Sequence, residues 1–224
     1  MKNFYTIAIF LIAFSINAQE NIKYQKPSKE ILDLVEFERP PSVQYDDDKN
    51  YMVFLYRDNY KSISDLSEKE LRLGGLRINP KTNIGSRVTF YNNVKIKKLK
   101  SKNGAVEQVS GLPDNPKLTN FAWSPDETKI ALTNTTDKGV ELWVLDLETT
   151  SVIKLTDAIL NANIGGVITW QADSQSMLVK TLSKNRKPLI DTSSIVPDGP
   201  TISNNYGAKA QNRTYQDLLK NKSD

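Results

Sequence analysis

The stretch from Trp123 to Leu132, WSPDETKIAL, decides the fold because its pattern occurs three times in this chain. In each copy an aromatic residue is followed three positions later by Asp, and an apolar triplet begins four positions after the Asp. The other two copies are Tyr45…Asp48…Met52-Val53-Phe54 and Trp170…Asp173…Met177-Leu178-Val179. Each copy predicts a strand, a tight turn that contains the Asp, and a returning strand. Hairpins repeated in this way are typical of a β-propeller or another radial β array.

The clearest unit surrounds the second copy and spans residues 120–156. Its apolar runs and turn residues predict four strands, at 120–123, 129–134, 140–147 and 151–156. The third strand has apolar side chains on both faces, with Val140, Leu142 and Val144 on one and Trp143, Leu145 and Leu147 on the other. This pattern predicts a sheet that is covered on both sides, as a propeller blade between two neighbours is.

Shorter elements are predicted in the rest of the chain. Ser28 favours the start of a helix at 29–35, and the capping-box spacing of Ser67 and Glu70 favours a second helix from about 64 to 73, ended by Gly74-Gly75. A strand at 76–78, a turn at 79–83, strand material at 88–99 and a hairpin turn at 102–104 follow. A further unit of the propeller type begins at Val167 and stops after Leu182.

The two ends of the chain differ from its middle. Lys2, an apolar run at 4–16 and the small residue Ala18 predict a secretory signal peptide at 1–18, and therefore a periplasmic or extracellular protein. An uncleaved anchor is the alternative, but the run is too short to span a bilayer comfortably, so no stable membrane span is expected after cleavage. Residues 19–182 are expected to form incomplete propeller blades. Residues 183–224 are expected to form a long loop and a short helix at 213–220.

The composition excludes several kinds of site. The 224 residues include no cysteine and no histidine, and the net charge is +4. Without cysteine there is no disulfide and no thiolate metal site. Without histidine this chain alone cannot build a Ser–His–Asp or Cys–His site. The basic run from Lys95 to Lys102 alternates with apolar residues, which favours a half-exposed hairpin over a nucleic-acid site, and no nucleic-acid partner is expected.

Three short motifs resemble functional sites, and each lacks something that the chemistry requires. Ser151-Val152-Ile153-Lys154 fits a Ser-x-x-Lys pattern without its companion motifs. The run Asp46-Asp47-Asp48 lacks the Gly and Glu of a calcium loop, and Asp191-Thr192-Ser193 lacks the Gly of an aspartic-protease loop. Trp123, Trp143 and Trp170 are expected to pack in the core rather than to bind a ligand. The sequence therefore assigns no catalytic, cofactor-binding or metal-ligating residue.

Four stretches together resemble a known family. They are Tyr24 to Val35, Glu70 to Asn83 with Ser86-Arg87, Phe121 to Leu132, and Val196 to Pro200 with Arg213 to Lys220. In this order they resemble the beginning of secreted serine peptidases of the prolyl-oligopeptidase family, in its glutamyl endopeptidase-like branch. The resemblance implies a β-propeller followed by an α/β-hydrolase domain that holds the nucleophile, acid and histidine. It places no catalytic residue in this chain.

The resemblance sets the expectations for fold and function. At about 40–50 residues per blade, the chain holds about three or four blades, so we expect an all-β, partial and open β-propeller of four-stranded blades with short helical insertions. Its implied role is non-catalytic: it restricts the access of peptide substrates to a hydrolase domain missing from this chain, which cuts after Glu. The alternative is a free-standing exported module that binds a protein or a glycan. Peptidase activity of this chain itself is disfavoured because histidine is absent.

Overall fold

The computed structural model describes residues 25–101, 104–189 and 206–207, in two units that divide after Glu38. The described part of the first unit contains the helix α2 (Lys29–Val35), which confirms the helix predicted there. The Ser28 carbonyl accepts the amides of Ile31 and Leu32 at 3.1 and 3.0 Å. Its side chain makes no capping bond within the described residues. The predicted signal peptide and the helix predicted at 213–220 lie outside the described residues.

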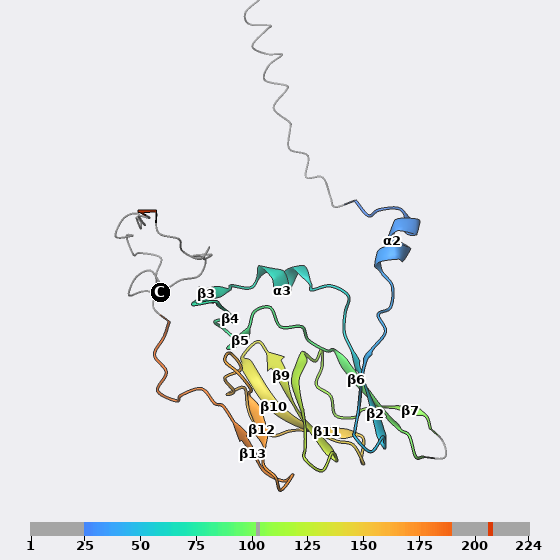
Figure 1. The fold of residues 1–224 in the computed structure, drawn as a ribbon. Coiled ribbons are helices and arrows are strands. Elements are labelled where there is room, and N and C mark those ends of the chain that lie inside the picture. The colour runs from blue at the N-terminus through green and yellow to red at the C-terminus, as the bar shows by residue number, and fades with distance from the viewer. Residues whose placement is uncertain (1–24, 102–103, 190–205, 208–224) are drawn as a thin grey trace, which may run out of the picture. The chain divides into compact units, whose positions relative to one another are not determined.

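The second unit consists mainly of antiparallel β-sheets (Figure 1). The first sheet has the order β1-β2-β6-β7, and the second sheet has the order β11-β10-β9-β8. The strands of the first sheet are β1 (Ser42–Tyr45), β2 (Tyr51–Tyr56), β6 (Asn93–Lys98) and β7 (Val106–Gln108). Those of the second are β8 (Leu118–Trp123), β9 (Lys129–Thr136), β10 (Gly139–Asp146) and β11 (Ser151–Lys154). A third hairpin pairs β12 (Ile168–Trp170) with β13 (Met177–Val179).

An insertion of residues 57–92 lies between β2 and β6 in the chain. It contains the helix α3 (Ile63–Ser67) and a small sheet of β3 (Leu71–Leu73), β4 (Leu76–Asn79) and β5 (Ile84–Gly85). The molecule is thus mostly β with a few short helices, which confirms the coarse expectation. The described ranges contain no closed ring of blades. They also contain no helix with the length and apolar character that crossing a lipid bilayer requires.

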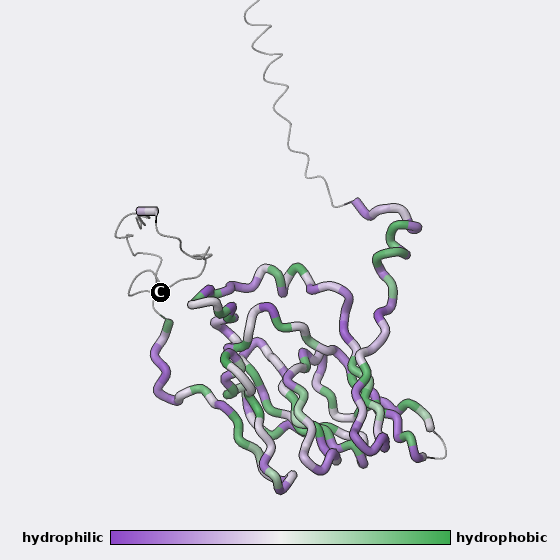
Figure 2. The backbone as a smooth tube through the Cα atoms, in the orientation of Figure 1, coloured by the Kyte–Doolittle hydropathy of each residue, from purple (hydrophilic) through white to green (hydrophobic). Residues whose placement is uncertain are grey.

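Two hydrophobic clusters hold the second sheet from its two sides. One joins the first and second sheets through residues that include Val53, Ile96 and Leu132, together with Leu145 on β10. The other places Leu142, from the opposite face of β10, against Ile84, Leu160 and Val167, with β12 and β13 side chains packed beside them. Figure 2 shows these apolar stretches along the strands. The predicted double-sided burial of the strand at 140–147 is therefore confirmed.

The helix predicted at 64–73 is wrong beyond Ser67. The capping box is made by Ser62 and Asp65, whose side chains accept each other's backbone amides at 3.1 and 3.3 Å, so the helix begins and ends earlier. Gly74 and Gly75 have φ of 54° and 87°, and they form the two-residue turn of the β3–β4 hairpin. A pair of residues with positive φ suits the twist of a tight hairpin, which explains why the glycines reverse a strand rather than end a helix.

The strand predicted at 88–99 is shorter than expected, because only 93–98 form β6. Residues 88–92 leave the sheet, and Tyr91 instead exchanges two backbone hydrogen bonds with Leu118 at the start of β8, at 2.8 and 2.9 Å. The β6–β7 hairpin is present, although residues 102 and 103 of its predicted turn lie outside the described residues. The predicted strands of the second sheet are all present, within a few residues of the expected bounds.

Candidate functional site

The three Asp-bearing turns share one backbone geometry. In each turn the fourth residue has a positive φ, of 53° at Lys49, 56° at Glu127 and 55° at Ser174. The amide of that residue donates to the carbonyl three positions earlier, at 3.1, 2.9 and 3.1 Å respectively. A turn that ends in a left-handed residue is a common connection between antiparallel strands. The repeated pattern in the sequence therefore corresponds to a repeated structure.

The three turns are also joined to one another. The Asp47 amide in the first turn donates to Glu127 Oε2 in the second at 2.8 Å. The Asp126 amide in the second turn donates to Ser174 Oγ in the third at 3.0 Å. Both bonds run from a backbone amide of one turn to the fourth residue of the next. The turns therefore lie side by side in sequence order at one end of the sheets.

The strands that precede these turns lie side by side as well. The Trp123 indole on β8 donates from Nε1 to Gln44 Oε1 on β1 at 3.1 Å. The Trp170 indole on β12 donates from Nε1 to the Ala122 carbonyl on β8 at 2.9 Å. The first strands of the three hairpins are therefore in contact in the order β1, β8, β12. The tryptophans are partly buried, and Trp123 packs against the cluster between the two sheets, so core packing describes only part of their role.

At the end of the sheets where the three turns lie, acidic side chains accept hydrogen bonds from the protein's own backbone and side chains. The Asp46 carboxylate accepts the amides of Asn50 and Tyr51 at 2.9 and 2.6 Å. The Tyr51 hydroxyl donates to Glu148 Oε2 at 2.9 Å, and partial burial together with this bond raises the pKa of Tyr51 to about 12. Among the described residues, no three acidic side chains are grouped so that they could hold a metal ion. The run at 46–48 is thus part of a turn, as the sequence indicated.

A polar cleft of about 810 Å³ lies at the other end of the second sheet. Its walls come from the insertion, from the segment 114–117 before β8, and from residues 134–137 at the end of β9. This end is opposite the Asp-bearing turns because 114–117 enter β8 and the turn at 124–127 leaves it. The insertion therefore adds a concave surface to this end of the second sheet.

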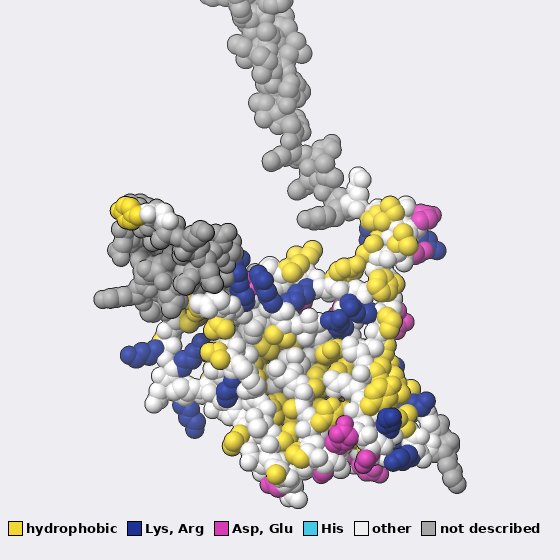
Figure 3. Space-filling view, viewed as in Figure 1, with side chains coloured by type: hydrophobic (Ala, Val, Ile, Leu, Met, Phe, Trp, Pro, Cys, Tyr) yellow, Lys and Arg dark blue, Asp and Glu magenta, His cyan; other side chains and the backbone are white. Residues whose placement is uncertain are grey.

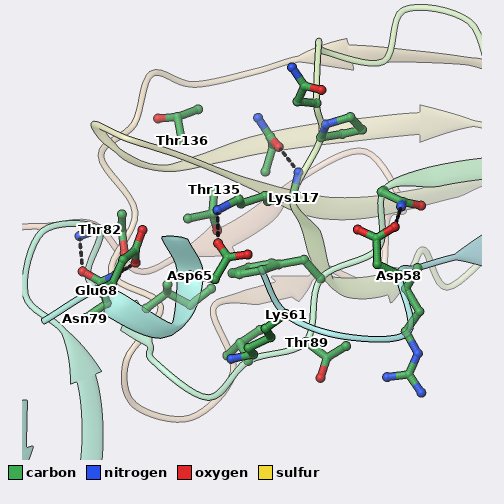
Figure 4. Close-up of a pocket in the computed structure, with 18 of the residues that line it drawn as sticks. Asp58, Lys61, Asp65, Glu68, Asn79, Thr82, Thr89, Lys117, Thr135 and Thr136 are labelled. Atoms are coloured by element: carbon green, nitrogen blue, oxygen red, sulfur yellow. Dashed lines mark hydrogen bonds and ion pairs between the residues drawn. The ribbon is translucent and has the colours of Figure 1, made fainter. Parts of the chain in front are cut away.

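An ion pair holds the insertion against the segment that precedes β8 at this cleft (Figure 4). Lys117 Nζ lies 2.6 Å from Asp65 Oδ1, and the Lys117 amide donates to Asn134 Oδ1 at 3.0 Å. The Lys117 ammonium also lies 5.9 Å from the centre of the Phe90 ring. The hydrogen bond from Lys117 is the main cause that lowers the pKa of Asp65 below its ordinary value. Both charges are thus engaged with each other, and this pair positions α3 over the cleft.

Two buried hydroxyl groups border the cleft. Thr82 and Thr135 are only 5% and 8% exposed, and their Oγ1 atoms have no hydrogen-bond partner among the described residues. A buried polar group without a partner costs about 1–3 kcal/mol. A small shift of either side chain would offer a hydrogen bond to a polar ligand in the cleft. The arrangement can therefore bind a polar chain by hydrogen bonds.

The Ser-x-x-Lys motif lies on β11 and does not form a site. Ser151 Oγ lies 2.7 Å from Thr149 Oγ1, whereas Lys154 Nζ lies 2.6 Å from Glu141 Oε1. Residues three apart on a strand point to opposite faces, which separates the two groups. The motif at 191–193 lies outside the described residues. The cleft residues Asp65, Thr82, Lys117 and Thr135 were not singled out by any sequence motif, because three distant segments bring them together.

Comparison with known proteins identifies relatives of this chain. No family model matches it. Two plant proteins, each named "Probable glutamyl endopeptidase, chloroplastic", from Arabidopsis thaliana and Oryza sativa subsp. japonica, are 31% identical to it over 218 and 214 residues. The chain is a distant homologue of part of the plant glutamyl endopeptidases. This confirms the resemblance to the glutamyl endopeptidase-like branch of the prolyl-oligopeptidase family.

The match covers most of this chain but only a part of each glutamyl endopeptidase. It covers 90% of this chain, and the chain spans 22% of the length of each relative. A match of this length extends well beyond the three repeated hairpins, which are common to many propellers. The sequence similarity therefore concerns most of the chain rather than one motif.

Proposed function

We propose that residues 19–182 form consecutive blades of an open β-propeller that is a non-catalytic part of a serine peptidase. The single observation that best supports this is that β1 contacts β8 and β8 contacts β12, through the hydrogen bonds of the Trp123 and Trp170 indoles. First strands in contact around a common axis are what a radial array requires. The hydrogen bonds between successive turns support the same arrangement.

The proposed role of these blades is to restrict which peptides reach a hydrolase domain on polypeptide outside this chain. The polar cleft beside Lys117 supports a surface that holds an extended peptide by hydrogen bonds, and the relatives' names support cleavage after glutamate. Export to the periplasm or beyond is part of the proposal, and it rests on the signal-peptide pattern at 1–18.

Two measurements test this function together. The purified chain should not cleave peptides that contain a Glu before the scissile bond, because it has no histidine to activate a serine. The nucleotide sequence that follows codon 224 should encode a hydrolase-type Gly-x-Ser-x-Gly motif in one of its frames. Turnover by the purified chain above a blank, or no such coding region in any frame, would overturn the proposal.

A second candidate function is a free-standing exported module that binds a polar ligand. The hydroxyls of Thr82 and Thr135, which have no hydrogen-bond partner in the part of the chain that the structure describes, lie beside the cleft of about 810 Å³ and favour it. This candidate requires that the purified chain unfold in one cooperative transition and remain monomeric or form a defined oligomer. Soluble aggregates without a thermal transition would reject it, because an open array with uncovered edges is prone to aggregate without its remaining blades.

A further inference from the structure

The carboxylate of Glu70, on the insertion, is surrounded by cationic groups. Its Oε1 lies 3.1 Å from Arg72 Nε and 3.3 Å from Arg77 Nη1. Its Oε2 lies 3.7 Å from Arg87 Nε and accepts a hydrogen bond from Ser86 Oγ at 2.5 Å. Four donor side chains thus converge on the two oxygens of one carboxylate. We call the three arginines the arginine cluster.

Two members of the arginine cluster oppose each other across a β-hairpin. Arg72 on β3 and Arg77 on β4 are direct partners in the antiparallel register. Like charges at directly opposite positions destabilise a sheet. Glu70 lies between them and offsets this repulsion, although exposed ion pairs contribute only about 0–1 kcal/mol. Stability alone therefore does not account for an arginine pair at this position.

Two of the three arginines of the cluster are well exposed to solvent, and Arg77 is mostly buried. The side chains of Arg72 and Arg87 are 61% and 69% exposed, and that of Glu70 is 22% exposed. The insertion carries seven basic and four acidic side chains, a net of +3 in a chain whose net charge is +4. Figure 3 shows Lys and Arg side chains gathered along the edge that holds α3 and β3–β5. The surface around Glu70 therefore attracts anionic groups.

We propose that Arg72, Arg77 and Arg87 form a binding site for the carboxylate of an acidic side chain in a peptide, and that Glu70 occupies this site in the unliganded chain. Guanidinium groups bind carboxylates in paired hydrogen bonds, and they lose little hydration on doing so. Glu70 supplies the same chemical group as a glutamate of the peptide, and the incoming carboxylate takes over its contacts. The choice of a peptide as ligand rests on the proposed function.

The position of Ser86 connects the arginine cluster with the polar cleft. Ser86 lines the cleft and donates to Glu70, and its carbonyl accepts from Lys61 Nζ at 3.0 Å. A peptide that lies in the cleft can therefore place one acidic side chain at the arginine cluster. Its backbone would meet asparagine and threonine side chains of the cleft wall, among them Asn79 and Thr82.

The experiment measures the binding of two fluorescently labelled peptides to the full chain, identical except for a central Glu or Gln. We expect the Glu peptide to bind more tightly, and its affinity to fall as salt is raised. Arg87→Gln should weaken the Glu peptide roughly tenfold, as expected when one charged hydrogen bond is lost, and should leave the Gln peptide unchanged. Lys100→Gln is the matched control, because it removes one exposed positive charge outside the cluster.

Glu70→Gln provides the sharper test. Removing the internal carboxylate should tighten the Glu peptide severalfold without changing the Gln peptide. A thermal melt of each variant verifies that it is folded, and Arg87→Gln keeps the proposal testable if Glu70→Gln unfolds. Displacement of the Glu peptide by a similar concentration of inorganic phosphate would overturn the assignment to a carboxylate. Retention of the peptide in phosphate would support it.

The outcomes separate this site from the proposed function, because the readout is binding and not peptidase activity. Equal binding of the two peptides to the wild-type chain, or equal effects of Arg87→Gln and Lys100→Gln, would overturn the arginine site and leave the proposed function standing. Absence of a downstream hydrolase coding region would overturn the proposed function, and a measured preference for Glu would still support the site.

Discussion

At the scale of single residues, the repeated Asp organises its turn by accepting local hydrogen bonds. Asp126 Oδ1 accepts from Ser124 Oγ at 2.7 Å and from the Thr128 amide at 3.1 Å. Asp173 Oδ1 accepts the amide two positions later in the same way, at 3.0 Å. In the first copy this role belongs to Asp46 rather than to Asp48, which the sequence pattern had aligned with the other two. An Asp can close a turn from more than one position, which explains the shift.

The acid sensitivity of the second turn follows from these bonds. The hydrogen bond from Ser124, then that from the Thr128 amide, lowers the pKa of Asp126 from 3.8 to about 2. A lowered pKa in the folded state means that the stabilisation is present above about pH 4 and is lost as the pH falls toward 2. Asp126→Asn should lower Tm by a few degrees at neutral pH and by progressively less below pH 4. Thermal melts from pH 7 to 2 would measure this, with Asp137→Asn as the control; parallel curves for wild type and Asp126→Asn would contradict it.

Gly111 is a second residue whose identity the structure explains. It has a φ of +81°, and a Cβ at this position would lie 2.5 Å from the Val152 carbonyl oxygen. Gly111→Ala should therefore lower the free energy of unfolding by at least about 2 kcal/mol, measured by urea denaturation. Gly166→Ala is the matched control, because a Cβ at that position would have no atom within 4 Å and should change stability little. Similar losses in the two variants would show that the contact with Val152 is not decisive.

At the scale of elements, substitutions on the two faces of β10 test whether the second sheet is covered on both sides. Leu145 faces the cluster shared with the first sheet, and Leu142 faces the cluster that includes Ile84 and Leu160. Leu142→Ala and Leu145→Ala should each destabilise the chain by about 2–5 kcal/mol, since both side chains are buried. Ile153→Ala, on an exposed position of β11, should change stability by less than about 0.5 kcal/mol. Urea denaturation measures all three, and a neutral Leu142→Ala would mean that this face is open.

A strand was predictable from the sequence where its residue pattern was compatible with only one kind of local structure. The apolar runs across 129–147 and the turn residues between them predicted the second sheet within a few residues, because both signals act locally. The helix predicted at 64–73 failed because Gly74-Gly75 suits both a helix end and a hairpin, and β3 forms only by pairing with β4. The cleft was not predictable, since Asp65 meets Lys117 across 52 positions of sequence.

At the scale of the whole molecule, the three repeated hairpins of the second unit are joined at two levels. Their turns are connected at one end, and their first strands are connected by the indoles of Trp123 and Trp170. The chain that has this arrangement is homologous to part of the plant glutamyl endopeptidases. A radial array built of successive hairpins is the physical basis of the proposed function, and it predicts that both indole protons lie at contacts between neighbouring strands.

Nuclear Overhauser spectroscopy on the ¹⁵N-labelled full chain tests this arrangement most directly, because the chain has three tryptophans and hence three indole N–H signals. The radial arrangement predicts a cross-peak from the Trp170 indole proton to Ala122 and one from the Trp123 indole proton to the Gln44 side chain. Both indole protons should also exchange slowly with solvent. Rapid exchange of both, with no cross-peak to β8 from Trp170 or to β1 from Trp123, would contradict the order β1, β8, β12 and with it the propeller.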